Sequence, residues 1–416
     1  MRASCPCFSA GLWLMSRIEP RKAKHRIFEP IMFDVVVIGG GITGAAASLS
    51  LTEQGLAVAL IEKRGIAAMA SGWTLGGVRQ SGRDPAELSL ARAAVAIWPT
   101  LGERLGADVH YRRGGNLRLA RDENEVAIIR ELVDRQRAQG LELEFLADNS
   151  AVRAIAPAIS PDVLAASFCP SDGHADPIAT TLAFAQAAKR KGCTLREGVA
   201  VNAIRVEKGR VTGVDTNAGF VPAGAVIVAA GVNTPALLAA RGLHLPLRAT
   251  LVQVLQTEKL PPLLDQVFGV ANADCAGRQE IDGRLRVTSG SLAFQGDVDG
   301  WSEQTLAPSR TEIAHLRELI GKVLPAVKDA QSHRAWGGLI DLTPDALPVL
   351  DAPEEIRGLV IGAGFSGHGF CLGPISGEVL ADLALGHKPR HEISAFRLAR
   401  FASAERRAPA ALSLHG

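Results

Sequence analysis

The segment that most constrains the fold is residues 34–44, where a short apolar run leads into a glycine turn. Its apolar part is continuous, as in a parallel strand that is buried on both faces. The turn has the pattern Gly-x-Gly-x-x-Gly at Gly39, Gly41 and Gly44. Gly39 permits a tight turn, Gly41 lets backbone approach a pyrophosphate, and Gly44 lets a following helix pack closely on the strand. The pattern therefore predicts the phosphate-binding turn of a dinucleotide site.

The sequence after the turn supports the same interpretation. An alanine-rich stretch predicts a helix through about residue 54, and Gly55 stands where such a helix would end. The apolar residues 57–61 predict a second strand, and Glu62 follows directly. A carboxylate at that position can accept both ribose hydroxyls, and it would repel the 2′-phosphate of NADP. The βαβ unit alone fits FAD and NAD equally, so an NAD-dependent dehydrogenase stays open at this point.

Composition argues against a polymer-binding role. The formal net charge of the 416 residues is +2 and aromatic residues make up 5%. Nucleic-acid binding usually needs a basic stripe interleaved with aromatic side chains. Hydrophobic residues at 47% and charged residues at 21% are ordinary for a globular chain. No stretch of 18 uninterrupted apolar residues occurs, so we expect a protein without a transmembrane span.

The cysteines form no Cys-x-x-Cys pair and no spacing typical of a zinc site, so we expect no metal. Scattered single thiols are typical of a reducing cytoplasm, which we take as the expected location. The six positions are Cys5, Cys7, Cys169, Cys193, Cys275 and Cys371. Residues 1–31 are basic and unpatterned in part, and we interpret them as a disordered extension or an artefact of an upstream start.

Distant segments add to the glycine turn. Residues 71–79 are rich in small residues and would let backbone approach a flat ring system. Residues 198–204 predict a strand after a helix over 180–191, and residues 225–235 predict a buried strand that ends in a glycine turn. Residues 358–371 combine an apolar strand with the run Gly362-Ala-Gly-Phe-Ser-Gly-His-Gly-Phe, and a helix is predicted from about Pro374 to Leu385.

Together these segments resemble the D-amino-acid oxidase family of FAD-dependent oxidoreductases. The pattern is most similar to a β-subunit-like branch that includes sarcosine oxidase β, proline or hydroxyproline dehydrogenase β and opine oxidase B. The resemblance covers about residues 33–388, and residues 111–120 resemble that branch's first strand of the substrate domain. It implies an α/β fold with a Rossmann-like FAD-binding domain of the glutathione-reductase type and an inserted α+β substrate domain with a mixed sheet.

The implied domains are discontinuous. The FAD-binding domain would comprise residues 32–110, 153–247 and 333–390, the substrate domain residues 111–152 and 248–332, and the C-terminal tail residues 391–416. Residues 251–257 and 285–289 alternate apolar and polar positions, as expected for half-covered strands of the substrate domain, and residues 311–323 predict an amphipathic helix that packs on them.

The resemblance implies FAD as the cofactor and a set of residues that would hold it. The glycine turn would bind the pyrophosphate, Glu62 the adenosine ribose and Val199 the adenine, while residues 76–78 and 364–369 would approach the isoalloxazine. The full set is Gly39, Gly41, Ile42, Thr43, Gly44, Glu62, Lys63, Ser71, Gly76, Gly77, Val78, Val199, Gly231, Gly364, Gly367, His368 and Gly369.

The chain departs from its relatives at the substrate carboxylate. Glycine oxidase-like members place an arginine after Trp-Ala-Gly-Leu, whereas here Ile340 and Asp341 follow that segment. Monomeric sarcosine oxidase-like members carry a lysine after Gly-His-Gly-Phe, and here that residue is Cys371. We expect Arg79 to take the carboxylate, with His368 as the second candidate catalytic residue near the flavin. Weaker candidates for the carboxylate are Arg248, Arg286 and Arg334, and His333 is a further candidate for a position near the flavin. His174 lies near the region where heterotetrameric sarcosine oxidase β attaches an FMN.

The expected reaction is oxidation of a C–N bond in an amino acid, an N-substituted amino acid or an opine. Hydride transfer to flavin N5 would give an imine that water hydrolyses. We expect a small amino-acid-like substrate, and a partner subunit or a respiratory acceptor for the electrons. The alternative is an electron-transfer or structural flavoprotein subunit of a multi-subunit amine dehydrogenase.

Overall fold

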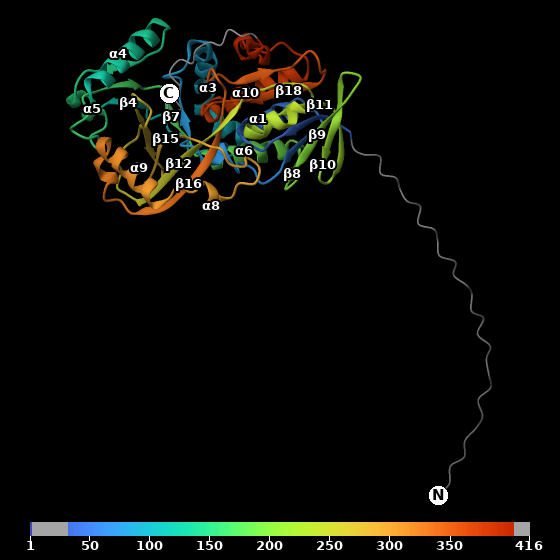
Figure 1. The fold of residues 1–416 in the computed structure, drawn as a ribbon, viewed down its shortest axis with the longest axis horizontal. Coiled ribbons are helices and arrows are strands. Elements are labelled where there is room, and N and C mark those ends of the chain that lie inside the picture. The colour runs from blue at the N-terminus through green and yellow to red at the C-terminus, as the bar shows by residue number, and fades with distance from the viewer. Residues whose placement is uncertain (2–31, 403–416) are drawn as a thin grey trace. The chain divides into compact units, whose positions relative to one another are not determined.

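The computed structural model describes Met1 and residues 32–402, and residues 32–402 belong to one compact unit. Most of the predicted N-terminal extension, and residues 403–416 of the predicted tail, lie outside the described residues. Figure 1 shows β12, β15, β16 and α9 on one side of this unit and β9, β10 and β11 on the opposite side. The fold is therefore organised around two separate sheets.

The first sheet has β1 (Phe33–Ile38) at its centre. β1 pairs in parallel with β2 (Val58–Glu62) and with β11 (Gly219–Val228). From Val35 to Ile38, alternate residues pack on opposite faces, which explains why all four are apolar. The other members are β8 (Thr194–Glu197), β18 (Leu359–Ala363), β17 (Val349–Asp351), β10 (Arg210–Thr216) and β9 (Val201–Glu207).

The second sheet is largely antiparallel, and its longest pairing joins β12 (Arg248–Lys259) to β16 (Ser332–Leu342) and β15 (Arg284–Ala293). The order continues through β14 (Cys275–Gln279), β13 (Val267–Val270), β4 (Asn116–Ala120), β6 (Ala165–Cys169) and β5 (Glu144–Leu146). A short ladder of β3 (Gly77–Val78) and β7 (Gly173–His174) lies outside both sheets.

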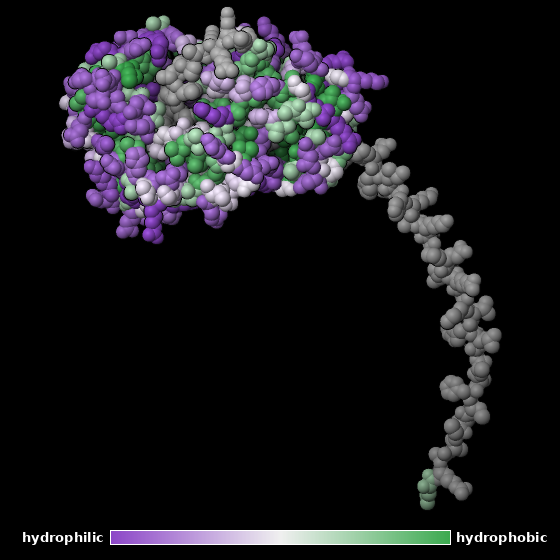
Figure 2. Space-filling view, viewed as in Figure 1, coloured by the Kyte–Doolittle hydropathy of each residue, from purple (hydrophilic) through white to green (hydrophobic). Residues whose placement is uncertain are grey.

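The helices that matter most for the site are α1 (Ile42–Glu53), α3 (Pro85–Leu105) and α10 (Gly369–Ala384). The others are α2 (Ala70–Trp73), α4 (Glu123–Ala138), α5 (Asn149–Ile155), α6 (Pro177–Arg190), α7 (Thr234–Ala239), α8 (Glu303–Leu306) and α9 (Arg310–Val323). On the face seen in Figure 2, side chains around α4 are predominantly hydrophilic, in keeping with the many exposed residues of that helix.

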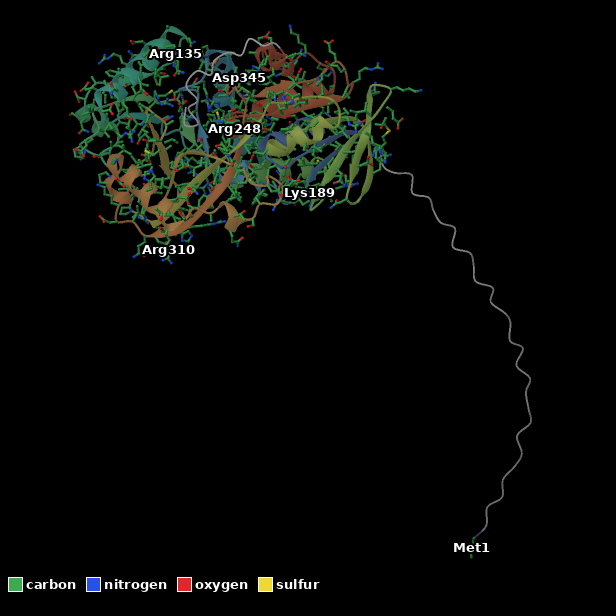
Figure 3. All side chains as sticks on the ribbon, viewed as in Figure 1. Met1, Arg135, Lys189, Arg248, Arg310 and Asp345 are labelled. Atoms are coloured by element: carbon green, nitrogen blue, oxygen red, sulfur yellow. The ribbon has the colours of Figure 1, made fainter. Side chains whose placement is uncertain are left out.

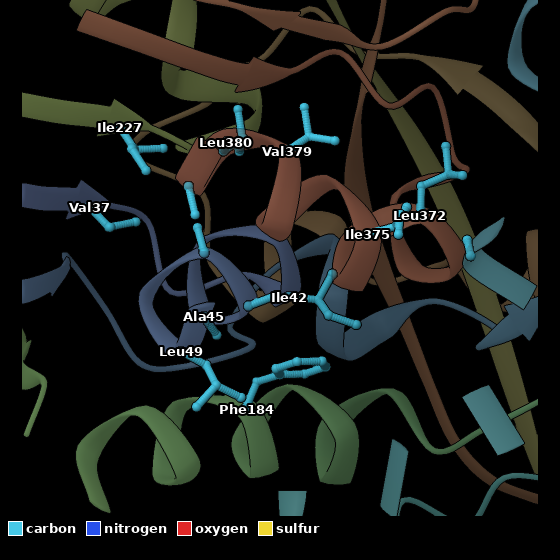
Figure 4. Close-up of a cluster of buried hydrophobic side chains, with 14 of the residues drawn as sticks. Val37, Ile42, Ala45, Leu49, Phe184, Ile227, Leu372, Ile375, Val379 and Leu380 are labelled. Atoms are coloured by element: carbon cyan, nitrogen blue, oxygen red, sulfur yellow. The ribbon is translucent and has the colours of Figure 1, made fainter. Parts of the chain in front are cut away.

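Helix α1 is buried from Ile42 to Thr52 because other elements cover it on several sides. Figure 4 shows Ile42 of α1 facing Ile375 of α10, and Leu49 of α1 facing Phe184 of α6. A Cβ at Gly377 would overlap α1 at Ala46, so small residues let α1 and α10 approach closely. This packing fixes the N-terminus of α1 at the end of β1.

The predicted elements around the glycine turn and in the second sheet occur close to their expected bounds. The predicted start of the last long helix is wrong, because α10 begins at Gly369 and contains Pro374. The residues before the proline are helical because they pack against α1, where a Cβ at Gly373 would meet Ile42. This tertiary contact outweighs the usual preference of proline for the start of a helix.

Sheet membership divides the chain somewhat differently from the predicted domain ranges. β6 and β16 fall within ranges that we assigned to the FAD-binding domain, yet both pair within the second sheet. The domain ranges themselves stay a prediction. Within the predicted tail, Phe396 is fully buried and Arg397 forms an ion pair of 3.0 Å with Asp351, so this segment starts with packed residues.

Candidate active site

The glycine turn has a backbone geometry that requires glycine. Gly39 has φ of +110°, and a Cβ on it would overlap the carbonyl oxygen of Ala229 at the end of the neighbouring strand. A Cβ on Gly44 would overlap the carbonyl oxygen of Gly39 itself. These close approaches hold the N-terminus of α1 directly beyond β1. The free N–H groups of that terminus are favourable partners for phosphate oxygens.

Two side chains already accept hydrogen bonds at this turn. The Ser71 hydroxyl accepts one from the N–H of Ile42 at 3.0 Å. The Glu62 carboxylate accepts from the N–H of Gly40 at 2.7 Å and from that of Arg64 at 2.7 Å. The ends of β2, α1 and α2 therefore converge on one point.

A cavity of about 530 Å³ extends from this turn to the second sheet, which is a normal size for a ligand site. Its lining includes Val252, Val254 and Phe268 from the second sheet. Most of the predicted site residues also line it: Gly39, Gly41, Ile42, Thr43, Glu62, Lys63, Ser71, Gly77, Arg79, Val199, Gly231, Gly367 and Gly369. The structure thus brings together segments that are up to 330 residues apart in the sequence.

Five predicted residues do not line the cavity, namely Gly44, Gly76, Val78, Gly364 and His368. Gly44 and Gly76 instead allow close backbone packing, since a Cβ on Gly76 would overlap the carbonyl oxygen of Ala175. Val78 is fully buried. These five residues lie outside the cavity lining, and their assignment to cofactor contacts stays a prediction.

The segment before Arg79 is held by two buried arginines of the second sheet. The guanidinium of Arg286 donates to the carbonyl oxygen of Thr74 at 2.9 Å, and Arg278 donates to that of Leu75. Glu280 lies 2.8 Å from Arg286 and 3.5 Å from Arg278, which balances part of their charge. Thr74 and Leu75 line the cavity, so the second sheet fixes the backbone there.

Arg79 lies in the cavity wall and is 7% exposed. Burial, together with the nearby guanidinium groups of Arg83 and Arg118, lowers the pKa of Arg79 to about 9. The group is still cationic at neutral pH. The charge of the buried Asp172 acts in the opposite direction and offsets part of this effect. A bound anion would offset the burial and the repulsion from neighbouring arginines further.

Arg83 is a site residue that the sequence analysis missed. It lines the cavity, and its side chain is 2% exposed. Its Nε donates to the carbonyl oxygen of Arg79 at 3.3 Å, while its buried Nη1 has no hydrogen-bond partner among residues 32–402. An arginine in the loop before a helix is indistinguishable from a solvated one in the sequence, so only the fold identifies it.

The side chain of His368 does not line the cavity but contacts Glu87. Its Nδ1 lies 3.0 Å from the carboxylate of Glu87, a fully buried residue of α3. Burial, and after it the charge of Arg83, lower the pKa of His368. Burial alone raises the pKa of Glu87, but His368 and Arg83 outweigh it and hold that pKa below its usual value. The two buried side chains therefore contact each other, and a catalytic role for His368 stays a prediction.

The weaker candidates lie outside the cavity lining. Arg248 is exposed at the start of β12 (Figure 3). Arg334 pairs with Glu303 at 3.3 Å, and His333 with Glu258 at 3.0 Å, both in exposed positions. His174 is buried, and its Nδ1 lies 3.2 Å from Nη1 of Arg278.

The run 362–369 is anchored by an aspartate of β16. Oδ2 of Asp341 accepts a hydrogen bond of 2.7 Å from the N–H of Gly364, whose φ is +69°. Asp341 and Gly367 both line the cavity. The carboxylate therefore helps to fix the turn that leads into α10.

The described part of the chain contains neither a membrane span nor a metal cluster. No helix between residues 32 and 402 is both long and apolar enough to cross a membrane. No group of three or more His, Cys, Asp or Glu side chains in the same residues is placed to hold a metal ion.

Comparison with known proteins identifies the family. A family model described as FAD dependent oxidoreductase (DAO) matches residues 34–383. The chain belongs to this family. The match confirms the resemblance predicted from the sequence and gives FAD as the cofactor.

Individual relatives agree with this membership. The beta subunit of sarcosine oxidase from Rhizobium meliloti is 27% identical over 378 residues, which cover 89% of this chain and 88% of the relative. D-amino acid dehydrogenase of Cereibacter sphaeroides is 30% identical, covering 73% and 68% of the two chains. The crystal structure of L-proline dehydrogenase from P. horikoshii matches with a TM-score of 0.83 at 28% identity, covering 91% and 100%. The predicted fold class is thereby confirmed.

The residues present fit FAD. The glycine turn forms a cradle in which side chains at Gly39 or Gly44 have no room, and the free N–H groups of α1 point beyond it. The cavity continues from this cradle past Glu62 to the second sheet. A long, two-ended ligand with a central pyrophosphate suits such a cavity.

Proposed function

We propose that this chain oxidises a C–N bond in an amino acid or an N-substituted amino acid, with FAD as the electron acceptor. The observation that carries the proposal is that one cavity is lined both by the dinucleotide turn and by the buried cation Arg79. A carboxylate substrate would pair with that cation. The names of the relatives, which include a sarcosine oxidase and a glycine oxidase, support the same class of substrate.

The proposed cofactor contacts follow from the lining. The N–H groups at Gly41 to Thr43 would bind the pyrophosphate, Glu62 would accept ribose hydroxyls, and the backbone near Val199 would approach the adenine. Gly77 and Gly367 would lie beside the isoalloxazine, where small residues permit close approach. When bound, FAD supplies the acceptor for a hydride from the substrate.

The chain's own part in the chemistry is to bind and orient the substrate. Arg79, with Arg83 beside it, would hold the carboxylate and so fix the α-carbon. Loss of a hydride from that carbon and of a proton from nitrogen gives an imine, which water hydrolyses. The carboxylate role of Arg79 replaces the arginine and lysine positions that are Ile340 and Cys371 here.

The test is anaerobic mixing of the purified, FAD-loaded chain with D-amino acids, glycine, sarcosine, proline, hydroxyproline and opines. We expect the visible flavin absorbance to bleach with at least one of them. If dithionite reduces the flavin but none of these compounds does, the proposal fails and an electron-transfer protein is the better description.

A variant pair tests the carboxylate assignment. In Arg79→Ala we expect the half-saturating concentration of the best substrate to rise by roughly 30-fold to 1,000-fold, the equivalent of about 2–4 kcal/mol. Arg334→Ala is the control, because that arginine is exposed and outside the cavity lining. Equal saturation in Arg79→Ala and the parent chain would show that another group holds the carboxylate.

The electron acceptor after FAD is part of the proposal. We favour a partner subunit or respiratory acceptor over oxygen, because the related sarcosine oxidase beta and opine oxidase B chains are named as subunits. A cytoplasmic location is proposed on the unpaired state of the four described cysteines. Reoxidation rates with oxygen and with an artificial dye would separate oxidase from dehydrogenase.

A further inference from the structure

One buried carboxylate of the cavity wall is not used by the proposed function. Asp341 lies on β16, is 7% exposed and lines the cavity. Its Oδ2 accepts from the N–H of Gly364 at 2.7 Å. Among residues 32–402, no lysine, arginine or histidine forms an ion pair with it. Asp341 therefore stands in the wall as a buried carboxylate whose described partners are backbone N–H groups.

The surroundings of Asp341 supply no compensating charge. In β12 its partner in register is Ala249, and the neighbouring Arg248 is exposed. The turn that packs on it, residues 364–366, has no titratable side chain. Burial raises the pKa of Asp341 to about 6, although hydrogen bonds from the backbone N–H groups of Gly364 and Phe365 act in the opposite direction. Within residues 32–402, no charged side chain contributes to this shift.

The charges that line the cavity have both signs. Arg79 and Arg83 are buried cations that line the cavity, and Asp341 is a buried anion that lines the same cavity. A substrate that carries a carboxylate and an ammonium group would complement both. An ammonium group near an uncompensated carboxylate offsets the unfavourable burial of that carboxylate.

We propose that Asp341 binds the substrate's ammonium group and takes one proton from it, an inference that rests on the proposed function. The step converts R₂NH₂⁺ and a carboxylate into R₂NH and a carboxylic acid, so charge and atoms balance and no oxidant is used. The nitrogen lone pair that is freed is the pair that forms the C=N bond when the hydride leaves. Burial lowers the pKa of the ammonium group, which makes the transfer easier.

The first test is the pH dependence of anaerobic flavin reduction in Asp341→Asn. Asparagine keeps an oxygen that can accept from Gly364 N–H, but it cannot take a proton. We expect reduction about 100-fold slower than in the parent chain at pH 7, and a deficit below about 10-fold at pH 10, where a much larger fraction of the substrate is the free amine. A deficit that is the same at every pH, or no deficit, overturns the proposal.

Asp351→Asn is the matched control. Asp351 is also a buried aspartate that accepts from a backbone N–H, that of Leu398 at 2.9 Å, but it does not line the cavity. We expect this variant to keep the pH profile of the parent chain. Failure of the proposed function looks different, because then the parent chain's flavin is not bleached by any amine.

A second measurement needs no variant and no turnover. Trimethylglycine carries a permanent positive charge and no transferable proton, whereas propanoate has a carboxylate and no nitrogen. Binding of each to the FAD-loaded parent chain can be followed by the change in the flavin spectrum from pH 5 to pH 8. We expect trimethylglycine to bind more weakly as the pH falls below 6, with no such loss for propanoate once its binding is referred to the concentration of its ionised form. Parallel pH profiles, or no binding of trimethylglycine at pH 8, count against Asp341.

Discussion

One wall of the cavity is made of backbone, whereas another is made of charged side chains. The glycine wall, residues 39–43 with Glu62, comes from one continuous βαβ unit, and its shape depends on the absence of side chains. The charged wall consists of Arg79, Arg83 and Asp341, which come from two different parts of the chain. The glycine wall can therefore serve many chains that bind the same cofactor, while the charged wall can change with the substrate.

The difference also lies in how each wall tolerates mutation. The glycine wall fails when a side chain is added at Gly39, because the new Cβ would overlap the backbone carbonyl oxygen of Ala229. A charged wall keeps its shape when a side chain is shortened but loses a specific interaction and leaves its partners uncompensated. We expect changes in the glycine wall to affect folding and FAD together, and changes in the charged wall to affect substrate and pH dependence.

The largest effect is expected for Gly39→Ala. The new Cβ would overlap the carbonyl oxygen of Ala229 in a backbone conformation of φ +110°, so both strain and overlap act. We expect the free energy of unfolding to fall by about 3 kcal/mol or more and FAD affinity to fall at least about 100-fold. Chemical denaturation and flavin fluorescence titration measure the two.

Gly55→Ala is the matched control for that variant. Gly55 also has a positive φ, +83°, but nothing lies within 4 Å of an added Cβ. We expect a loss of about 1 kcal/mol in stability and no change in FAD affinity. If Gly39→Ala behaves like Gly55→Ala, the glycine wall tolerates side chains and the contrast with the charged wall is lost.

A smaller effect, with a defined pH dependence, is expected for Asp341. Burial raises its pKa in the folded chain to about 6 from a usual value of 3.8, so the folded state holds the proton more tightly than the unfolded state. Stability from this group is present at low pH and is lost as the pH rises through 6. Relative to Asp341→Asn, the parent chain should lose about 2 kcal/mol between pH 4 and pH 8.

Denaturant unfolding of the FAD-free chains at several pH values measures this difference. A difference between parent and variant that does not change with pH would mean that Asp341 has an ordinary pKa in the folded chain. The proton step proposed for the active enzyme would then lack its physical basis, although Asp341 could still anchor Gly364.

The two walls also differ in how far the sequence predicts them. Gly39, Gly41, Gly44 and Glu62 lie within one local unit of a strand, a turn and a helix, so a local pattern is enough to predict that they lie close together. Asp341 acquires its role through pairing of β16 with β12 and through the turn at Gly364. Such contacts depend on the tertiary fold, and no local pattern indicates them.

For His368, too, the sequence does not predict the direction of the side chain. Its neighbours Gly367 and Gly369 line the cavity, but its own side chain turns to Glu87, which belongs to a helix 281 residues earlier. A buried carboxylate needs a hydrogen-bond donor, and the tertiary fold decides which residue supplies it. The sequence pattern predicts that the segment around residue 368 lies near the site, whereas the direction of the His368 side chain depends on packing with α3.

The smallest effect is expected for a side chain that contacts the glycine wall. The Ser71 hydroxyl accepts from the N–H of Ile42 at 3.0 Å and so occupies one donor of the N-terminus of α1. Ser71→Ala should reduce the stability of the FAD-free chain by about 1 kcal/mol, as for loss of a helix cap. Ser50→Ala is the control, because the buried Ser50 hydroxyl has no hydrogen-bond partner among the described residues and its loss should be nearly neutral.

With FAD bound, the pyrophosphate would offer acceptors to the N–H of Ile42, so we expect the loss in Ser71→Ala to shrink when unfolding is measured with saturating FAD. An equal loss with and without FAD would mean that Ser71 keeps this hydrogen bond in the bound state. The Ser71 side chain would then have to be counted as part of the glycine wall.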